Sequence, residues 1–185
     1  MKKKAVIISL KGYKLLKNEK KLLSDEKPWG LILFKRNIKS LKQIKRLVKE
    51  IRKFAKDKKF PILIDEEGGK VSRLRKIINH EFSQKLFGDI YRQNENLALA
   101  FYKNYLKNIT FVLKTIGINI NTVPVLDVLR NNTSKVIGNR SFSKKPIIVK
   151  KLGQTCVNHY KINKIGTVIK HIPGHGCAAL DSHFK

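Results

Sequence analysis

The chain has 185 residues, of which 42% are hydrophobic and 29% are charged. This apolar content is enough to bury a core and excludes a disordered tail, and the length is that of one domain. The formal net charge of +28 attracts nucleic acid, anionic lipid or acidic metabolites, but lysine is spread along the whole chain and does not mark one binding face.

Short apolar segments alternate with longer segments of helical periodicity. The strand-like segments, in chain order, are residues 5–10, 30–34, 60–64, 118–125 and 167–171. The helical segments are residues 41–55 after a Ser40 cap, residues 94–116 before Gly117, and residues 146–160 beginning at Pro146. The alternation predicts an α/β fold built around a parallel sheet.

Two features bear on the cellular compartment. Cys156 and Cys177 are too few for a disulfide framework and favour a reducing environment. The apolar stretch at residues 5–9 is shorter than a signal-peptide core, and no window approaches the roughly 18 apolar residues of a membrane span. We therefore expect a cytoplasmic protein with no membrane partner.

Polar clusters follow three of the predicted strands. They occupy residues 65–69, 127–140 and 170–176, directly after the third, fourth and fifth strands. Because functional sites in parallel α/β folds form at the carboxyl ends of the strands, these clusters are expected to share one rim of the sheet.

The first cluster contains three consecutive carboxylates at residues 65–67, which repel one another and need partners. One interpretation is a solvated acidic turn neutralised by Lys70, Arg73 and Arg75. The other is a ligand site, since a carboxylate can accept hydrogen bonds from vicinal sugar hydroxyls and an arginine offers a planar fork of donors. Asp65 and Arg73 are the candidates for that role.

Two further basic positions lie on the same predicted rim. Arg140 occupies a glycine-bearing loop, where it either pairs with Asp127 or Glu66 to brace the rim or binds a ligand. Lys170 and His171 end the fifth strand, so their side chains are expected on opposite faces, with one of them toward the barrel axis.

Three of the five histidines fall within residues 171–183. Imidazoles and a carboxylate suit zinc, but this spacing matches no compact zinc motif, so we expect neither a metal nor a cofactor. Asp181 and His183 can instead form a dyad in which the carboxylate fixes the imidazole tautomer and raises its basicity. His183 is then a proton shuttle on a loop able to swing over a substrate.

Six segments in this order resemble the motif series of bacterial beta-N-acetylhexosaminidases of glycoside hydrolase family 3. They are residues 30–37, 65–73, 124–127, 137–142, 170–176 and 181–183. The resemblance covers nearly the whole chain and is weakest over residues 76–93. It implies that residues 1–185 form the N-terminal part of a TIM-type (β/α) barrel, with about five of the eight β/α units, since a complete barrel takes roughly 250 residues.

The resemblance also implies a function. Family members remove terminal N-acetylglucosamine from muropeptides in the cytoplasm during peptidoglycan recycling, with retention of configuration through a covalent glycosyl-enzyme. It assigns the acid/base dyad to His183 and Asp181, in place of the usual pair of carboxyl groups about 5 Å apart. It assigns sugar binding to Asp65, Arg73, Arg140, Lys170 and His171.

The carboxylate nucleophile of the family lies on a later strand, and no residue of this chain matches it. Hydrolysis by these residues alone is therefore not expected, and a second chain that supplied the missing strands would restore the barrel. Two alternatives stay open: an inactive sugar-binding remnant, and a basic nucleic-acid-binding protein. The aromatic residues fall mostly on predicted core positions and no nucleic-acid-binding motif occurs, so specific nucleic-acid binding is not expected.

Overall fold

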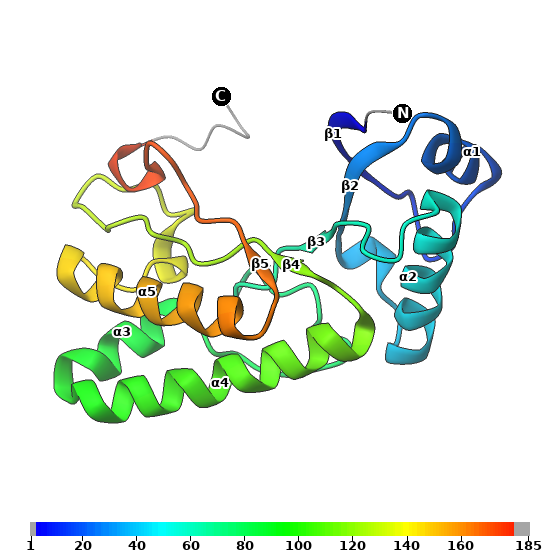
Figure 1. The fold of residues 1–185 in the computed structure, drawn as a ribbon. Coiled ribbons are helices and arrows are strands. Elements are labelled where there is room, and N and C mark those ends of the chain that lie inside the picture. Colours follow the sequence, from blue (N-terminus) through cyan, green and yellow to red (C-terminus); the bar gives the residue numbers. More distant parts are fainter. Residues whose placement is uncertain (1–2, 180–185) are drawn as a thin grey trace.

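The computed structural model describes residues 3–179, in which five parallel strands alternate with helices (Figure 1). The strands form one sheet in chain order: β1 (Lys4–Ser9), β2 (Pro28–Leu33), β3 (Ile62–Ile64), β4 (Ile120–Asn121) and β5 (Gly166–Thr167). The helices are α1 (Lys17–Asp25), α2 (Leu41–Ala55), α3 (Gln84–Gln93), α4 (Glu95–Ile116) and α5 (Pro146–Ile162). Short 3-10 turns are η1 (Lys35–Asn37), η2 (Gly138–Arg140) and η3 (His175–Cys177). The predicted α/β fold is confirmed.

Local sequence signals set the ends of the longer helices. The Ser40 hydroxyl accepts a hydrogen bond of 3.2 Å from the Gln43 backbone N–H, so α2 begins where the sequence predicts. Gly117 ends α4 with φ of +93°, a left-handed conformation that disfavours a side chain. The helices α1 and α3 were not predicted from the sequence. Both are short, and α1 buries a single residue, Leu23, which leaves little periodic apolar pattern.

The last two strands are much shorter than predicted. The fourth was expected over residues 118–125, but regular pairing covers only β4, since Pro124 has no N–H to donate to the ladder. The fifth was expected over residues 167–171, but β5 ends at Thr167, and beyond it a single bridge joins Val125 to Lys170. Beyond these strands the two segments stay joined by isolated backbone hydrogen bonds, such as the one of 2.6 Å from the Leu126 N–H to the Lys170 carbonyl.

The core lies between the sheet and its helices. In Figure 1, α4 and α5 run side by side next to β4 and β5, while α1 and α2 lie beside β1 and β2. Fully buried side chains come from the central strands and from the inner faces of the helices: Leu31, Leu33, Ile62, Ile64, Ile44, Ile51, Leu113 and Leu152. Within residues 3–179, no helix has the length and hydropathy that crossing a membrane requires.

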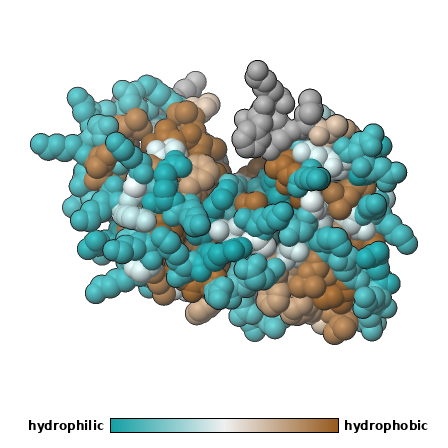
Figure 2. All heavy atoms as spheres, turned by 180° about the vertical axis from the view of Figure 1, so that it is seen from behind, coloured by the Kyte–Doolittle hydropathy of each residue, from teal (hydrophilic) through white to brown (hydrophobic). Residues whose placement is uncertain are grey.

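Both edges of the sheet carry exposed apolar side chains. The edge strand β1 exposes Val6 and Ile7 to 46% and 45%, and the segment after β5 exposes Val168 and Ile169 to 43% each. Figure 2 shows apolar side chains gathered at the upper left of the view, over the region of β1 and β2, and a further apolar group at the lower right. Within residues 3–179, no strand pairs with the outer side of β1 or of β5, so the sheet is open at both sides.

Candidate functional site

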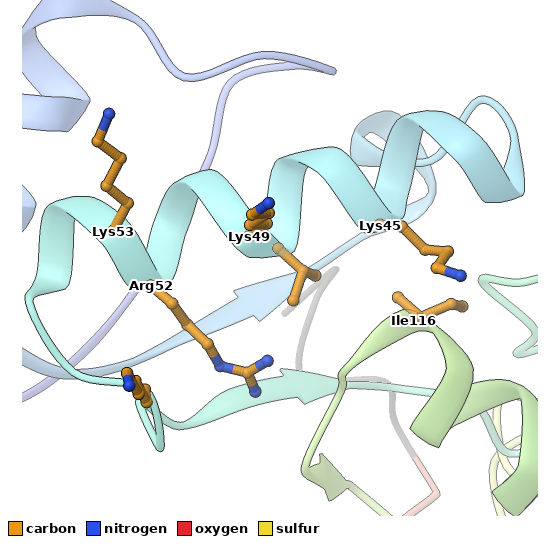
Figure 3. Close-up of a pocket in the computed structure, with 7 residues that line it drawn as sticks. Lys45, Lys49, Arg52, Lys53 and Ile116 are labelled. Atoms are coloured by element: carbon orange, nitrogen blue, oxygen red, sulfur yellow. The ribbon is translucent and has the colours of Figure 1, made fainter.

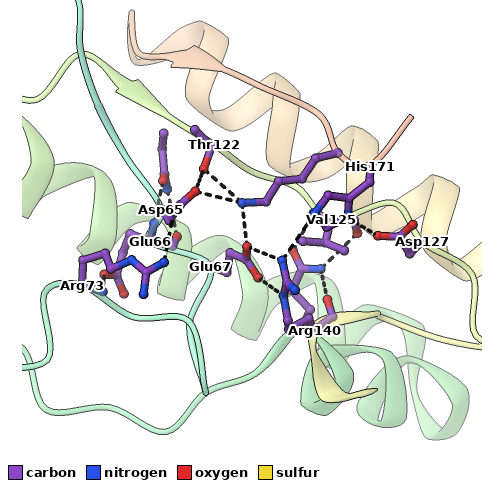
Figure 4. A network of polar contacts seen from close by, with 12 residues as sticks. Asp65, Glu66, Glu67, Arg73, Thr122, Val125, Asp127, Arg140 and His171 are labelled. Atoms are coloured by element: carbon purple, nitrogen blue, oxygen red, sulfur yellow. Dashed lines mark hydrogen bonds and ion pairs between the residues drawn. The ribbon is translucent and has the colours of Figure 1, made fainter. Parts of the chain in front are cut away.

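Three segments that follow β3, β4 and β5 meet at the carboxyl end of the sheet (Figure 4). The ammonium group of Lys170 lies 3.0 Å from Asp65 Oδ1 and 3.1 Å from Thr122 Oγ1. The Thr122 hydroxyl also donates a hydrogen bond to Asp65. The predicted convergence of the strand-end clusters on one rim is therefore confirmed.

Glu67 lies at the centre of this network. Its side chain is only 1% exposed, and it accepts hydrogen bonds of 2.8 Å and 3.0 Å from Arg140 and an ion-pair contact of 2.6 Å from Lys170. One of the two interpretations of Arg140 paired it with Asp127 or Glu66, and this choice of partner is wrong, because the guanidinium pairs with Glu67. The Glu66 carboxylate points into the interior, toward the backbone of Arg73 and Leu74, and Glu67 is the carboxylate that binds the guanidinium.

Glu66 organises the loop that returns Arg73 to the site. Its carboxylate accepts hydrogen bonds of 2.8 Å from the backbone N–H groups of Arg73 and Leu74, and lies 3.3 Å from His80 Nε2. Arg73 in turn reaches Asp65, with Nη2 3.2 Å from Oδ2. A solvated acidic turn is thus the wrong interpretation for Glu66 and Glu67, because as whole residues they are only 2% and 4% exposed.

Lys170 and His171 enter the same polar network, and the expectation that they point to opposite faces is wrong. The His171 Nδ1 atom lies 2.6 Å from Asp127 Oδ2, and its Nε2 atom lies 3.5 Å from Arg140 Nη2. The alternation of a strand does not apply here because β5 ends at Thr167.

The charges of the network stabilise one another. Burial of Asp65 opposes its ionisation, but the nearby Lys170 ammonium, the Thr122 hydroxyl and Arg73 together hold the pKa of the Asp65 carboxyl below its ordinary value. Burial likewise disfavours the charged form of Arg140, yet its hydrogen bonds to Glu67 raise the pKa of the guanidinium. Both groups therefore stay ionised at neutral pH.

Exposure separates two kinds of side chain in the network. The carboxylates of Glu67 and Asp127 are 1% and 0% exposed and can only hold their neighbours. The five predicted sugar-binding side chains keep between 14% and 34% of their surface accessible: Asp65, Arg73, Arg140, Lys170 and His171. A neutral ligand with several hydroxyl groups could exchange hydrogen bonds with acceptors and donors held this close together.

The predicted dyad, Asp181 and His183, lies outside the described residues. The segment that leads to the dyad is described as far as residue 179. In this segment, the backbone N–H groups of His175 and Gly176 donate to Asp127 Oδ1 over 2.5 Å and 3.0 Å. Two residues of the site were not predicted from the sequence: Glu67 as the partner of Arg140 and Lys170, and Asp127 as the acceptor for this turn. In the part of the chain that the structure describes, no group of three or more His, Cys, Asp or Glu side chains is placed to hold a metal ion.

A model of the glycosyl hydrolase family 3 N-terminal domain matches residues 2–185. The chain belongs to this family. Among curated relatives, a beta-hexosaminidase of Idiomarina loihiensis is 35% identical over 178 residues, which is 96% of this chain and 52% of the relative. A beta-hexosaminidase of Hydrogenovibrio crunogenus is 32% identical over 180 residues, covering 97% of this chain and 50% of the relative.

Solved structures agree with the family 3 assignment. NagZ from Neisseria gonorrhoeae, crystallised with N-trifluoroacetyl-D-glucosamine, superposes with a TM-score of 0.87 at 29% identity, over 99% of this chain and 54% of NagZ. A family 3 beta-N-acetylglucosaminidase from a Paenibacillus strain gives a TM-score of 0.82 at 28% identity, over 96% of this chain and 33% of that one. The five parallel strands are thus part of a family 3 barrel, and the chain spans about half the length of the curated relatives it matches.

The family 3 chain also has a basic groove away from the strand-end site (Figure 3). The groove lies between α2 and the end of α4, has a volume of about 420 Å³, and has Val48 and Ile116 as its apolar lining. Its cationic lining consists of Lys45, Lys49, Arg52, Lys53 and Lys58. Arg52 donates a 2.6 Å hydrogen bond to the Gly117 carbonyl, which places the groove near the amino ends of β3 and β4. This cationic groove is a feature that would attract phosphate groups and therefore favours the nucleic-acid alternative.

We expect this basic surface to bind DNA only by general charge attraction. Five phosphate contacts imply an affinity loss of about 500-fold between 50 and 200 mM salt, measured by fluorescence anisotropy with a 20-base-pair duplex. The charge pair Lys49→Glu with Lys53→Glu in the groove should weaken binding no more than the control pair Lys103→Glu with Lys107→Glu on α4. Tight, salt-tolerant binding lost only in the groove variant would contradict this expectation.

Proposed function

We propose that this chain is the N-terminal half of a beta-N-acetylglucosaminidase that removes terminal N-acetylglucosamine from muropeptides in the cytoplasm, as part of peptidoglycan recycling. The observation that carries the proposal is the meeting of five accessible polar side chains at one strand-end site, held in place by buried carboxylates. Relatives named beta-hexosaminidase and a related structure crystallised with an N-acylated glucosamine support it.

Each side chain has a role in this proposal. The Asp65 carboxylate accepts hydrogen bonds from vicinal sugar hydroxyls, and the cations of Arg73, Arg140 and Lys170 donate to sugar oxygens. His171, whose Nε2 atom lies 3.5 Å from Arg140 Nη2, contacts the sugar beside that guanidinium. The three cations are balanced by the carboxylates of Asp65, Glu67 and Asp127, so the site favours a neutral, hydroxyl-rich ring over an ion.

The chemistry proper needs groups outside the described residues. We assign proton transfer to His183, oriented by Asp181, and nucleophilic attack to a carboxylate on a strand beyond this chain, which gives retention through a covalent glycosyl-enzyme. The exposed edges at β1 and β5 are where the remaining strands of the barrel would pair, from the same polypeptide or from a second chain. Closure of the barrel would cover Val6, Ile7, Val168 and Ile169.

Calorimetric titration with N-acetylglucosamine tests the binding half of the proposal. We expect Asp65→Ala to raise the Kd at least tenfold, because hydrogen bonds to a charged group contribute about 1.5–3 kcal/mol. Asp89→Ala, which removes an exposed carboxylate on α3, is the matched control and should leave the Kd unchanged. Equal affinities for Asp65→Ala and the unaltered chain would remove Asp65 from the sugar site.

Turnover separates the enzyme from the inactive remnant. A fluorogenic N-acetyl-beta-glucosaminide should be cleaved when this chain is combined with the remaining strands of the barrel. Binding without cleavage by that combination would favour a sugar-binding remnant. Absence of both binding and cleavage would refute the proposed function.

A further inference from the structure

The Asp127 carboxylate accepts hydrogen bonds from two separate parts of the site. Asp127 follows β4, and its side chain is completely buried. The Oδ2 atom lies 2.6 Å from the Nδ1 atom of His171, and Oδ1 accepts hydrogen bonds of 2.5 Å and 3.0 Å from the backbone N–H groups of His175 and Gly176. One carboxylate thus joins a predicted sugar-binding imidazole, beside which it lies in Figure 4, to the turn that leads toward residues 181–183.

The neighbours of His171 determine where its ring carries a proton. The Asp127 carboxylate is an acceptor, so the Nδ1 atom must be the N–H donor. On the other side of the ring, Nε2 lies 3.5 Å from Arg140 Nη2, and a guanidinium offers only donors. Both neighbours therefore fit the same tautomer, in which Nδ1 carries the proton and the Nε2 lone pair faces the Arg140 guanidinium.

The second oxygen of Asp127 holds the backbone of η3. Two successive N–H groups share this oxygen, and the turn packs so closely that a Cβ atom on Gly176 would lie 2.3 Å from the Val128 carbonyl oxygen. Loss of the carboxylate would leave both N–H groups without their acceptor. The position of the turn therefore depends on the same side chain as the tautomer of His171.

We infer that Asp127 is a positioning residue, which holds His171 as the Nδ1–H tautomer so that the Nε2 lone pair faces the Arg140 donor of the sugar site, and which fixes the turn before Asp181 and His183. The inference rests on the proposed function only for the identity of the ligand. The tautomer and the anchored turn are properties of the chain without sugar, so they are testable separately.

The variant Asp127→Asn separates the two tasks. The amide oxygen can still accept from the N–H groups of His175 and Gly176, whereas the amide NH2 must then donate to Nδ1 of His171. The opposite orientation of the amide is unfavourable, because its NH2 group would then face the N–H donors of His175 and Gly176. We therefore expect the ring proton of His171 to move to Nε2, opposite the Arg140 donor, while the turn stays in place.

Nitrogen-15 NMR of the histidine rings reports the tautomer directly. The spectra are recorded at a pH of about 8.5, above the ordinary histidine pKa of about 6.5. We expect His171, assigned by the loss of its signals in His171→Gln, to be Nδ1–H in the unaltered chain and Nε2–H in Asp127→Asn. His159, whose ring lies on α5 away from this site, is the internal control. An Nε2–H tautomer in the unaltered chain, or no change in the variant, would overturn the inference.

Two further measurements complete the test. Hydrogen exchange at the amide of Gly176 should stay slow in Asp127→Asn and become at least tenfold faster in Asp127→Ala; equal exchange in all three proteins would contradict the anchoring role. The Kd for N-acetylglucosamine should rise about tenfold in Asp127→Asn. If the unaltered chain shows the expected tautomer but binds no N-acetylglucosamine, the proposed function fails while the positioning role stands.

Discussion

Replacement of Gly88 by alanine is expected to lower the free energy of unfolding by about 3 kcal/mol or more, although the same change inside a helix ordinarily stabilises it by about 1 kcal/mol. Gly88 lies within α3, where an added Cβ would come 1.8 Å from the carbonyl oxygen and 2.7 Å from the carbonyl carbon of Phe142. Backbone atoms cannot turn aside as a flexible side chain would. The helix must therefore move away from the 140–142 loop.

This displacement should also reach the sugar site. Gln84, in the first turn of α3, donates hydrogen bonds to the backbone carbonyls of Val125 and Arg140. A shifted α3 removes that support from the loop that carries the Arg140 guanidinium. We therefore expect Gly88→Ala to lower the affinity for N-acetylglucosamine together with stability.

Urea unfolding followed by circular dichroism measures the effect. Gly12→Ala is the matched control, because no atom lies within 4 Å of a Cβ placed at Gly12, and its stability should change by less than about 1 kcal/mol. A Gly88→Ala chain as stable as the unaltered one would show that α3 does not pack against Phe142 as described.

Removal of the central carboxylate in Glu67→Ala is expected to cost about 3 kcal/mol of stability and to abolish measurable sugar binding. Breaking a buried ion pair by removing one partner leaves an uncompensated charge, which costs about 3–5 kcal/mol when burial is complete. Here Arg140 and Lys170 keep 14% and 16% of their side-chain surface exposed, so water compensates in part. Lys170 also retains its contact with Asp65.

Two companion variants make this prediction specific. Glu67→Gln keeps the shape of the side chain and one acceptor oxygen, so it should cost less than Glu67→Ala. Glu81→Ala removes an exposed carboxylate, 76% accessible, that pairs with Arg75 at 3.3 Å, and should cost less than about 0.5 kcal/mol. If Glu67→Ala were as mild as Glu81→Ala in urea unfolding, the buried network would contribute little to the fold.

Much of the architecture was predictable from local sequence patterns. The apolar spacing of residues 41–55 and 94–116, with Ser40 and Gly117 at their ends, predicted α2 and α4 closely, because burial on one helix face repeats every three to four residues. The polar clusters after three predicted strands indicated a shared rim, since parallel strands align their carboxyl ends. The order of the motifs along the chain indicates the family.

The sequence alone thus determined the fold class, the longer helices and the end of the sheet at which polar residues gather. Only the tertiary structure decided which charge meets which. Glu66 and Glu67 are neighbours of the same type, yet one holds the Arg73 loop and the other holds Arg140 and Lys170. Their directions depend on a turn at Gly68 and Gly69, with φ of +93° and +57°, and on partners up to about a hundred residues away. Short-range periodicity encodes which face of an element is buried, whereas the direction of a side chain in a loop is set by long-range contacts that no local pattern contains.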